Sequence, residues 1–587
     1  MPVSDGVPKV LRVDLTSGEN FVEPATEIFQ KWMGGTGVGT YLFSEELEKA
    51  GNPEPLAPEA PIIFTIGALA SLYPMVTKSV VTFRSPLTGE FGQSYAGGRF
   101  SACMRLSDLD AIIITGKAPD LRFLWVDNKN VEIIDATPLA GLSTYATFRV
   151  LREQFKDEPR KRSIVRIGVG GERIIPYANL TVDQFRHFGR LGAGAVFGSK
   201  NLKALMVSGN YSYPLPREHF KEYQEIYKEI YDQCMSPTMS KYHDLGTAIN
   251  VEPLSQIGGL PTRNFKQGFF EGAKYISGAK FAEESLAYKV ACTHCPVACI
   301  HVAHLREQFA AEHEYETLSV AYDHELIYAL GSTLSLDNVP DILKLIHKIE
   351  RYGLDSITTG VTLAWATDAF LSGLISTEDT AGLALAFGNT DNYLKAIDHI
   401  VDGTTTFYQD MQLGSEQVAK KYGGLDYAIC FGGLEAPGYM TGRDFIVGFS
   451  MSPRNSHLSN AGYSLDQKAL SKPTTPEEEV QELVAEANWR NILNSLTICL
   501  FARGIYTKDL VLRCFNAVGK EWTEEQFEEL GKKIHRLKFD VKQRLGWTLE
   551  GLRVPERLYQ VISSRGIVKK EEVEQMLQEY WEIVQSY

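Results

Sequence analysis

The sequence predicts an α+β protein in which an N-terminal β-sheet domain is followed by two mainly helical domains. Short β-branched runs separated by turn residues fill the first third of the chain. Capped segments with helical periodicity fill the middle and the end. The length of 587 residues agrees with several domains, because about 150 residues per domain is usual. We place the domain boundaries at 1–208, 209–422 and 423–587.

The N-terminal third contains a series of candidate strands. Turn signals such as Asp127-Asn128-Lys129-Asn130 separate some of them, and their spacing favours antiparallel sheet over repeated βαβ units. The candidate strands are residues 10–15, 62–66, 79–83, 111–115, 122–126, 131–134 and 164–167.

Helix-start and helix-stop signals are clear in the remaining two thirds. Asn338 with Pro340 opens an apolar-periodic segment, and Gly353 follows it at a position typical of a helix end. A long amphipathic helix is predicted over residues 571–584. Two further helices begin with capping-box pairs, Thr475 with Glu478 and Thr523 with Gln526.

Composition excludes several classes of protein. The chain has 73 acidic and 59 basic residues and a net charge of −14, whereas broad nucleic-acid binding needs a dominant basic field. It has no apolar run of the roughly 18 residues that span a membrane. The first residues lack a signal-peptide pattern, so we expect a cytoplasmic protein. In a reducing compartment, a cluster among eight cysteines indicates a metal or catalysis.

Three motifs do not carry the function that they first suggest. The glycine run 34–39 has the wrong spacing for a dinucleotide loop, so we interpret it as a turn close to a ligand or to backbone. Residues 192–200 lack the Gly-Lys-Ser/Thr of a P-loop, although Lys200 and Lys203 beside them would suit a phosphate. His324-Glu325 lacks the second histidine of a zinc-protease motif.

The strongest motif is a cysteine triplet, Cys292-x2-Cys295-x3-Cys299. Three thiolates at this spacing can converge on one inorganic centre, and a [4Fe–4S] cluster needs a fourth cysteine from elsewhere. Zinc is the alternative, although four-cysteine zinc sites usually consist of two C-x2-C pairs. The candidates for the fourth ligand are Cys103, Cys234, Cys430, Cys499 and Cys514.

A large iron–sulfur protein without a ferredoxin domain is best interpreted as a redox enzyme. One cluster passes one electron at a time, so two-electron chemistry needs a second centre. The sequence has no nucleotide or haem motif. We therefore expect a cofactor held by glycines, backbone amides, arginine and lysine.

Several ordered segments are typical of one family. They are Phe83-Arg-Ser-Pro-Leu-Thr-Gly89, Ala96-Gly-Gly-Arg-Phe100, residues 110–117 and 189–204, the cysteine triplet, Glu314-Tyr-Glu-Thr317 and residues 353–360. With these segments the chain resembles the aldehyde ferredoxin oxidoreductase family, tungsten enzymes with a bis-pterin cofactor, over about residues 8–510. Many ordered matches are more specific than any single motif.

The resemblance implies a fold and a set of cofactors. The N-terminal β domain would form a base for the pterins, and the two helical domains would follow. The cofactors would be a tungsten bis-pterin and one [4Fe–4S] cluster. Molybdenum is the alternative metal, because the same dithiolene ligands hold either, and a Mg²⁺ ion bridging the pterin phosphates is compatible with the resemblance.

The resemblance also implies a reaction and partners. A small aldehyde and water would give a carboxylic acid, while two electrons reduce W(VI) to W(IV). The electrons would leave singly through the cluster to a ferredoxin or a ferredoxin-like Fe–S subunit. Assembly into an oligomer is compatible with the family.

The family's binding residues are carried over position by position. The cluster ligands would be Cys292, Cys295, Cys299 and Cys499. The pterin-binding residues would be Lys78, Tyr95, Gly97, Arg186, His187, Gly189, Arg190, Glu350, Leu354, Asp355, Ser456, His457, Leu458, Asn494, Ile498, Cys499 and Leu500.

Three catalytic residues follow from the same resemblance. Glu316 would be the general base that activates water. His457 would donate a hydrogen bond to the carbonyl or to a metal oxo group. Tyr315 would line the pocket.

Departures from the family pattern mark a side branch. Glu350 and Asn494 stand where the family has Asp, and Thr497 stands where it has Gly. Lys344-x-x-His347 replaces a Glu-x-x-His pair, so we predict no subunit-bridging iron. The alternative functions are the active-site subunit of a class II benzoyl-CoA reductase-like enzyme, a non-catalytic Fe–S electron-transfer subunit and a zinc-stabilised scaffold.

Overall fold

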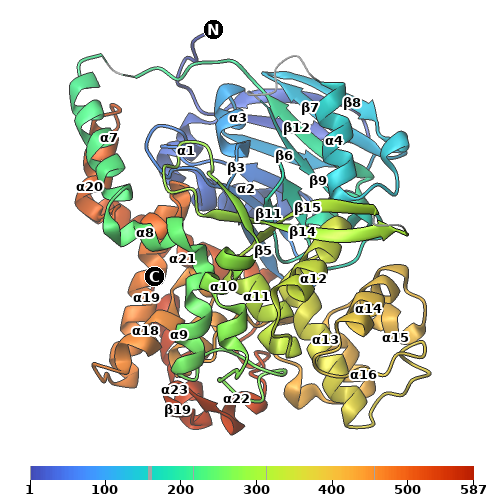
Figure 1. Ribbon diagram of the computed structural model, residues 1–587. Helices are drawn as coiled ribbons and strands as arrows, with labels where there is room; N and C mark the ends of the chain where they lie inside the picture. Colours follow the sequence, from blue (N-terminus) through green and yellow to red (C-terminus); the bar gives the residue numbers. More distant parts are fainter. Residues whose placement is uncertain (1, 156–161, 216, 312–313, 455) are drawn as a thin grey trace.

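The structure is a computed structural model that describes residues 2–155, 162–215, 217–311, 314–454 and 456–587. Figure 1 shows two sheets with their helices in one half of the molecule and mainly helices in the other. The hairpin of β14 (Ile300–Ala310) and β15 (Glu314–Tyr322) runs between the two halves. The predicted α+β class is confirmed.

The N-terminal domain contains two six-stranded sheets. The first has the order β2-β1-β6-β3-β4-β5 and the second the order β11-β10-β9-β12-β7-β8. Strands of the first sheet are β1 (Lys9–Asp14), β2 (Asn20–Pro24), β3 (Ile62–Thr65), β4 (Ser79–Arg84), β5 (Phe91–Ala96) and β6 (Ala111–Thr115). Those of the second are β7 (Arg122–Asp127), β8 (Asn130–Asp135), β9 (Arg162–Arg166), β10 (Leu180–Val182), β11 (Arg186–Phe188) and β12 (Leu202–Ser208).

Every predicted strand is present, but the antiparallel prediction is wrong for two pairs. β1 pairs with β6 in parallel, and β7 pairs with β12 in parallel. A parallel pair needs a long crossover connection, and here helices lie within both connections. Local strand spacing therefore misses these pairs.

Helices of the N-terminal domain are α1 (Thr26–Trp32), α2 (Gly35–Lys49), α3 (Phe100–Leu106), α4 (Thr144–Gln154), α5 (Val169–Glu172) and α6 (Ala193–Ser199). The middle of the chain contains α7 (Phe220–Cys234), α8 (Pro237–Asp244), α9 (Val251–Gln256), α10 (Gly278–Glu284), β13 (Leu286–Val290), α11 (His324–Leu330), α12 (Val339–Tyr352), α13 (Ser356–Leu371), α14 (Thr390–Asp402), α15 (Thr406–Met411) and α16 (Ser415–Tyr422). The last part contains β16 (Cys430–Phe431), β17 (Leu434–Glu435), α17 (Arg443–Ser450), α18 (Gly462–Ala469), α19 (Pro476–Ser495), α20 (Lys508–Asn516), α21 (Glu524–Arg544), α22 (Arg557–Gln560), β18 (Ile562–Ser563), β19 (Gly566–Ile567) and α23 (Lys570–Gln585).

The predicted helix ends are confirmed. The Asn338 side chain caps α12, and Gly353 ends that helix in the left-handed conformation with φ of 72°. Thr475 and Thr523 open α19 and α21, each with both hydrogen bonds of a capping box. Among the described residues, no helix is long and apolar enough to cross a membrane.

The two glycine segments serve close backbone packing. A Cβ at Gly35 would lie 2.3 Å from the Asn494 carbonyl oxygen, so α2 can approach the end of α19 only through glycine. Lys200 is buried and donates to the Pro58 carbonyl, and buried Lys203 donates to that of Leu142. The expected phosphate cradle is therefore wrong, because both ammonium groups support the fold.

The hydrophobic core joins the ends of the chain. One cluster of buried side chains contains α1 and α2 residues together with residues of α19, α20 and α21. This packing holds the segment after α19, which contains Cys499, against the N-terminal domain. Residues far apart in sequence thereby meet where the two halves of the molecule join.

Candidate active site and cluster site

Tertiary packing brings Cys499 to the cysteine triplet. Burial raises the pKa of the Cys295 thiol to about 12, and the nearby Cys499, Cys292 and Cys299 raise it further. Two backbone hydrogen bonds fix this approach: the Cys499 amide donates to the Met75 carbonyl at 2.9 Å, and the Met75 amide donates to the His294 carbonyl at 3.0 Å. Of the remote cysteines, Cys499 is the one that neighbours the triplet among the described residues.

A glycine, Gly97, and two cations, Lys78 and Arg186, lie close to the triplet cysteines. A Cβ at Gly97 would lie 2.6 Å from the Cys292 Sγ and 3.4 Å from the Lys78 Nζ. Burial raises the pKa of Cys299 to about 11, whereas Arg186 and Lys78 oppose this rise by favouring the thiolate. No group of three or more His, Cys, Asp or Glu side chains in the described ranges is placed to hold a metal ion.

A buried carboxyl–imidazole pair lies in the helical half. The Nε2 of His457 is 3.4 Å from the Oε1 of Glu325, and the Glu325 Oε2 accepts a 2.9 Å hydrogen bond from the Gly438 amide. Burial raises the pKa of Glu325 to about 7 and lowers the pKa of His457 well below its ordinary value. Near neutral pH the imidazole is therefore uncharged and the carboxyl is poised to exchange a proton.

Aromatic and imidazole rings enclose this pair. Tyr439 stacks on Tyr463 with 4.1 Å between ring centroids and lies 5.4 Å from the His457 ring. The Nε2 of His324 lies 3.1 Å from the Gly438 carbonyl oxygen. Its buried Nδ1 has no hydrogen-bond partner within the described chain. Buried polar atoms usually have a hydrogen-bond partner, so this nitrogen is free to bind a water molecule or a ligand.

A second carboxyl–imidazole pair lies where β11 meets α12. The Tyr145 hydroxyl donates to the Glu350 Oε2 at 2.6 Å, and the His187 Nε2 is 3.8 Å from the Glu350 Oε1. Burial raises the pKa of Glu350 to about 7 and lowers the pKa of His187 to about 3. At pH 7 the His187 imidazole is therefore uncharged, and the Glu350 carboxyl group is partly protonated.

The neighbouring predicted residues make separate contacts. Arg190 pairs with Asp355 at 2.9 Å, and Asp355 also caps α13. Leu354 forms a backbone bridge with Ala178. A Cβ at Gly189 would meet only the His187 Cβ, at 3.8 Å, so this glycine faces open space.

Three buried cations lie beside the predicted pterin-binding residues Tyr95, Leu458 and Asn494. Arg454 lies over the Tyr95 ring at 4.2 Å, and Arg490 donates to the Leu458 carbonyl at 2.9 Å. Lys538 is 1% exposed, and its hydrogen-bond partner among the described residues is the Asn491 amide oxygen at 2.8 Å. Burial and the nearby Arg454 hold the pKa of Lys538 well below its ordinary value. A small cavity joins Arg454, Asn494 and Lys538.

The remaining predicted residues shape the backbone here. The Ser456 side chain accepts from the Leu458 amide at 3.2 Å. The Ile498 amide donates to the Leu493 carbonyl at 3.0 Å, and Leu500 opens a short 3₁₀ turn. The last two contacts lie directly after α19, on either side of Cys499.

Comparison with known proteins covers both halves of this arrangement. The family description "Aldehyde ferredoxin oxidoreductase, N-terminal domain" matches residues 10–209, and "Aldehyde ferredoxin oxidoreductase, domains 2 & 3" matches residues 223–585. The chain belongs to the aldehyde ferredoxin oxidoreductase family. It is an oxidoreductase of a family of tungsten enzymes.

Individual relatives are distant. A tungsten-containing aldehyde ferredoxin oxidoreductase from Pyrococcus abyssi is 30% identical over 98% of this chain and 95% of its own length. The WOR-like subunit of an aliphatic sulfonate oxidoreductase from Pyrococcus furiosus is 30% identical over 67% of this chain and 64% of its own length. A solved structure of the active site complex BamBC of benzoyl coenzyme A reductase with 1,5-dienoyl-CoA has a TM-score of 0.82 at 19% identity, covering 100% of this chain and 95% of that one. It shares the fold.

Two of the catalytic residues expected from the family resemblance lie apart from the buried carboxyl–imidazole pair. Glu316 and Tyr315 are exposed on β15. Glu316 lies opposite Glu307 in the register of β14 and β15, and the Arg306 guanidinium lies over the Tyr315 ring. His457 is buried, and the carboxylate beside it is Glu325 at the start of α11. The Glu-Tyr-Glu-Thr segment lies on the β14–β15 hairpin, which carries its side chains away from the buried pair. The rejected His324-Glu325 pair, followed by an apolar run, was the available signal for Glu325.

The buried surroundings fit the cofactors of this family. Four cysteines are the number of donors that a [4Fe–4S] cluster needs, and Cys499 lies near the triplet, although among the described residues the thiols are not gathered into a metal-binding group. Gly97 leaves the space beside Cys292 that a side chain would fill, and the buried Nε of Arg186 lacks a hydrogen-bond partner among the described residues. Arg454 and Lys538 are buried cations that suit an anionic ligand. The residues around Lys538 form no recognisable binding motif, so only its burial draws attention to this side chain.

Proposed function

We propose that this protein oxidises aldehydes to carboxylic acids with water at a tungsten bis-pterin centre. The observation that carries the proposal is the buried pair of Glu325 and His457, because His457 belongs to the segment Ser456–Leu458 expected to bind pterin. A carboxyl group with a pKa near 7 is suited to general acid–base chemistry at neutral pH. The bound metal–pterin group would supply the two-electron oxidation.

Glu325 and His457 would handle the protons. Glu325 would deprotonate the water that attacks the aldehyde carbon, and later release that proton. His457 is neutral, so its ring can orient the carboxylate through Nε2 without forming a fixed ion pair. The surrounding rings of Tyr439 and Tyr463 would exclude bulk water and keep the carboxyl pKa raised.

The cofactors would be held by residues from all three parts of the chain. Cys292, Cys295, Cys299 and Cys499 would hold one [4Fe–4S] cluster as thiolates. Gly97, Arg186, His187, Arg190 and the segments around Glu350, Ser456 and Asn494 would contact the pterins. We add Arg454 and Lys538, because two buried cations near Tyr95 and Asn494 need an anionic partner.

Electrons would leave through the cluster to a ferredoxin or an Fe–S subunit. Lys78 and Arg186 lie next to the cysteines and would stabilise negative charge there. Elemental analysis would distinguish tungsten from molybdenum and would show whether a Mg²⁺ ion accompanies the pterin phosphates.

The test combines metal content and activity of anaerobically purified protein. We expect about one W and about four Fe per chain and aldehyde-dependent reduction of benzyl viologen. Replacing Glu325→Gln should lower the aldehyde-dependent rate by about 10²- to 10⁴-fold, the usual worth of a general base. The matched control Glu316→Gln, on an exposed carboxylate, should leave the rate unchanged.

Other results would overturn parts of this proposal. Zinc without iron would contradict the cluster. Iron without W or Mo in freshly prepared protein would favour an electron-transfer subunit. Full metal content with no activity on a panel of aldehydes, but reduction of benzoyl-CoA with a strong donor, would move the chain to the benzoyl-CoA reductase type of function.

A further inference from the structure

A large pocket lies between the start of helix α4 and helix α12. Its volume is about 580 Å³, within the usual range for small-molecule sites. The charged side chains in its described lining are Lys344, Lys348, Arg351 and Glu307. None of the catalytic, pterin-binding or cluster residues of the proposed function is among the lining residues, so the pocket needs an explanation of its own.

One face of α12 supplies three cations to this pocket, because Lys344, Lys348 and Arg351 recur at helical spacing. Lys344 pairs with Asp341 at 3.2 Å. Lys348 pairs with Asp398 at 2.6 Å. Arg351 is exposed and has no ion pair or hydrogen bond from its side chain within the described chain. Its guanidinium group can therefore pair with a ligand without breaking a contact of the fold.

A buried histidine on the same face also lines the pocket. His347 is 8% exposed, and neither of its ring nitrogens has a hydrogen-bond partner among the described residues. Burial and the nearby Arg351 lower the pKa of His347 to about 4, so at neutral pH the ring is uncharged and carries one N–H donor. Buried donors usually have a partner, so this N–H is available to a ligand or a water molecule in the pocket.

The start of α4 forms another wall of the pocket, which Gly141, Leu142, Ser143 and Ala146 line. The Ser143 hydroxyl caps the helix by accepting from the Ala146 amide at 3.2 Å. The first turn of this 11-residue helix still contains amides without an acceptor in the helix, and it carries the positive end of the helix dipole. Anions bind at helix starts for both reasons.

We propose that the pocket between α4 and α12 binds a phosphate group, carried either by inorganic phosphate or by a ligand of nucleotide size. The Arg351 guanidinium would pair with the phosphate oxygens, and the His347 N–H would donate a hydrogen bond to them. Asp341 and Asp398 already pair with the two lysines, and Glu307 also lines the pocket. Binding would therefore depend on the directed donors of Arg351, His347 and α4.

The two elements that enclose this pocket are already joined on their other side. The Thr144 hydroxyl of α4 donates to the Glu350 carbonyl of α12 at 2.7 Å, and the Tyr145 hydroxyl donates to the Glu350 carboxylate at 2.6 Å. A phosphate bound across α4 and α12 would hold the same two elements together from the pocket side. We therefore expect the ligand to stabilise the folded chain.

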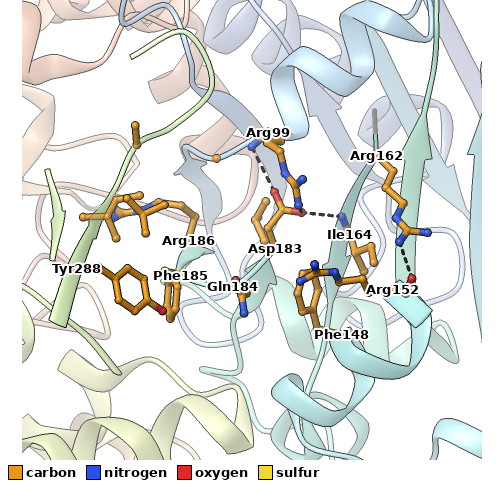
Figure 2. A pocket seen from close by; sticks show the side chains of 15 residues that line it. Arg99, Phe148, Arg152, Arg162, Ile164, Asp183, Gln184, Phe185, Arg186 and Tyr288 are labelled. Atoms are coloured by element: carbon orange, nitrogen blue, oxygen red, sulfur yellow. Dashed lines mark hydrogen bonds and ion pairs between the residues drawn. The ribbon is translucent and has the colours of Figure 1, made fainter. Parts of the chain in front are cut away.

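The pocket at the other end of α4 differs in kind, as Figure 2 shows. There Arg162 donates to the Arg152 carbonyl in the last turn of the helix. Arg99 pairs with Asp183 at 3.4 Å. Cations at a helix end stabilise its free carbonyl groups, which gives Arg162 a structural role. The described linings of the two pockets have no residue in common.

The experiment is calorimetric titration of the anaerobically purified full-length protein at fixed ionic strength. Sodium phosphate and ADP are the two probes, used separately. Arg351→Gln removes the unpaired charge, and His347→Leu removes the buried donor at similar size. The control is Lys221→Gln on α7, where the lysine side chain is 90% exposed and the helix lies on another side of the molecule from α4 and α12 (Figure 1).

The expected result is one phosphate-binding site that responds selectively to these variants. Arg351→Gln and His347→Leu should each raise the Kd for phosphate at least about fivefold, whereas Lys221→Gln should leave it unchanged. Equal Kd values for the two probes would identify the phosphate group alone as the ligand, and tighter binding of ADP would identify a nucleotide-like ligand.

Three results overturn the proposal. One is the absence of saturable binding of either probe up to about 5 mM. Another is equal affinity in wild type and in both pocket variants. The last is self-association that Arg351→Gln abolishes while no phosphate binds, because the pocket would then be an interface between copies of this chain.

This inference goes beyond the proposed function, and the two fail separately. Absence of aldehyde-dependent viologen reduction would contradict the proposed function without changing the phosphate titration, which needs no turnover. In chains without cofactor, phosphate could also bind to the residues expected to hold the pterins. Such binding would not respond to Arg351→Gln or His347→Leu, so these variants assign the titrated site to the pocket between α4 and α12.

Discussion

Replacing Glu325→Gln should make the cofactor-free protein more stable at high pH, whereas it should lower the activity of the cofactor-loaded enzyme. The folded protein raises the pKa of Glu325 from 4.5 to about 7, mainly through burial. The folded state therefore holds this proton more tightly than the unfolded state. The resulting destabilisation is absent below about pH 4.5 and grows as the pH rises towards the folded pKa.

The magnitude follows from these two pKa values. The interval from 4.5 to about 7 corresponds to about 3 kcal/mol at about 1.36 kcal/mol per pH unit. Glutamine has the same shape, never ionises, and its carbonyl oxygen can still accept from the Gly438 amide. The variant should thus be about 3 kcal/mol more stable than wild type at about pH 8, with a difference of below about 1 kcal/mol at about pH 5.

Thermal unfolding of the cofactor-free protein at the two pH values measures this effect. At about 2.1 cal/mol/K per residue, 587 residues give an unfolding entropy of about 1.2 kcal/mol/K, so Tm should rise by about 2–3 °C at about pH 8. Glu316→Gln is the control, because that side chain is exposed. An equal Tm change at both pH values, or a lower Tm at about pH 8, would refute the burial argument.

Three further predictions test the binding surroundings. Gly97→Ala should lower iron content by at least about half, because its Cβ would lie 2.6 Å from the Cys292 Sγ, whereas Gly504→Ala, with open space around it, should retain full iron by colorimetric assay. Lys538→Met should raise the Tm of cofactor-free protein, since a buried unpaired cation is removed, yet lower tungsten retention measured by mass spectrometry. Cys499→Ser should abolish the Fe–S absorption band, while serine at the four fully buried cysteines should preserve it.

The site has a stability cost that its chemistry explains. Carboxyl groups of Glu325 and Glu350 are both buried with a pKa near 7, and each faces an imidazole of lowered pKa. Groups whose pKa values are strongly shifted cluster at functional sites. Lys538 and Arg454 add positive charge nearby, for which the described residues provide no ion-pair partner. An anionic cofactor would relieve that positive charge, so binding should stabilise the folded chain.

Local sequence determined the parts of this protein that depend on neighbouring residues. Helix caps at Asn338, Thr475 and Thr523 are visible because a cap and its partner are three residues apart. Strands are visible because β-branched runs alternate with turns. The cysteine triplet is visible because its three members stand close together in the sequence.

Only the tertiary structure decided the pairs that meet across the chain. Glu325 and His457 are 132 positions apart, and an apparently better local match placed the carboxylate on an exposed hairpin instead. Strands β1 and β6 run parallel because the intervening chain returns through helices. Lys538 becomes a cofactor candidate only because α21 packs against α19 and buries its charge. Burial and long-range packing set these contacts and the resulting pKa values, and no local pattern in the sequence encodes either.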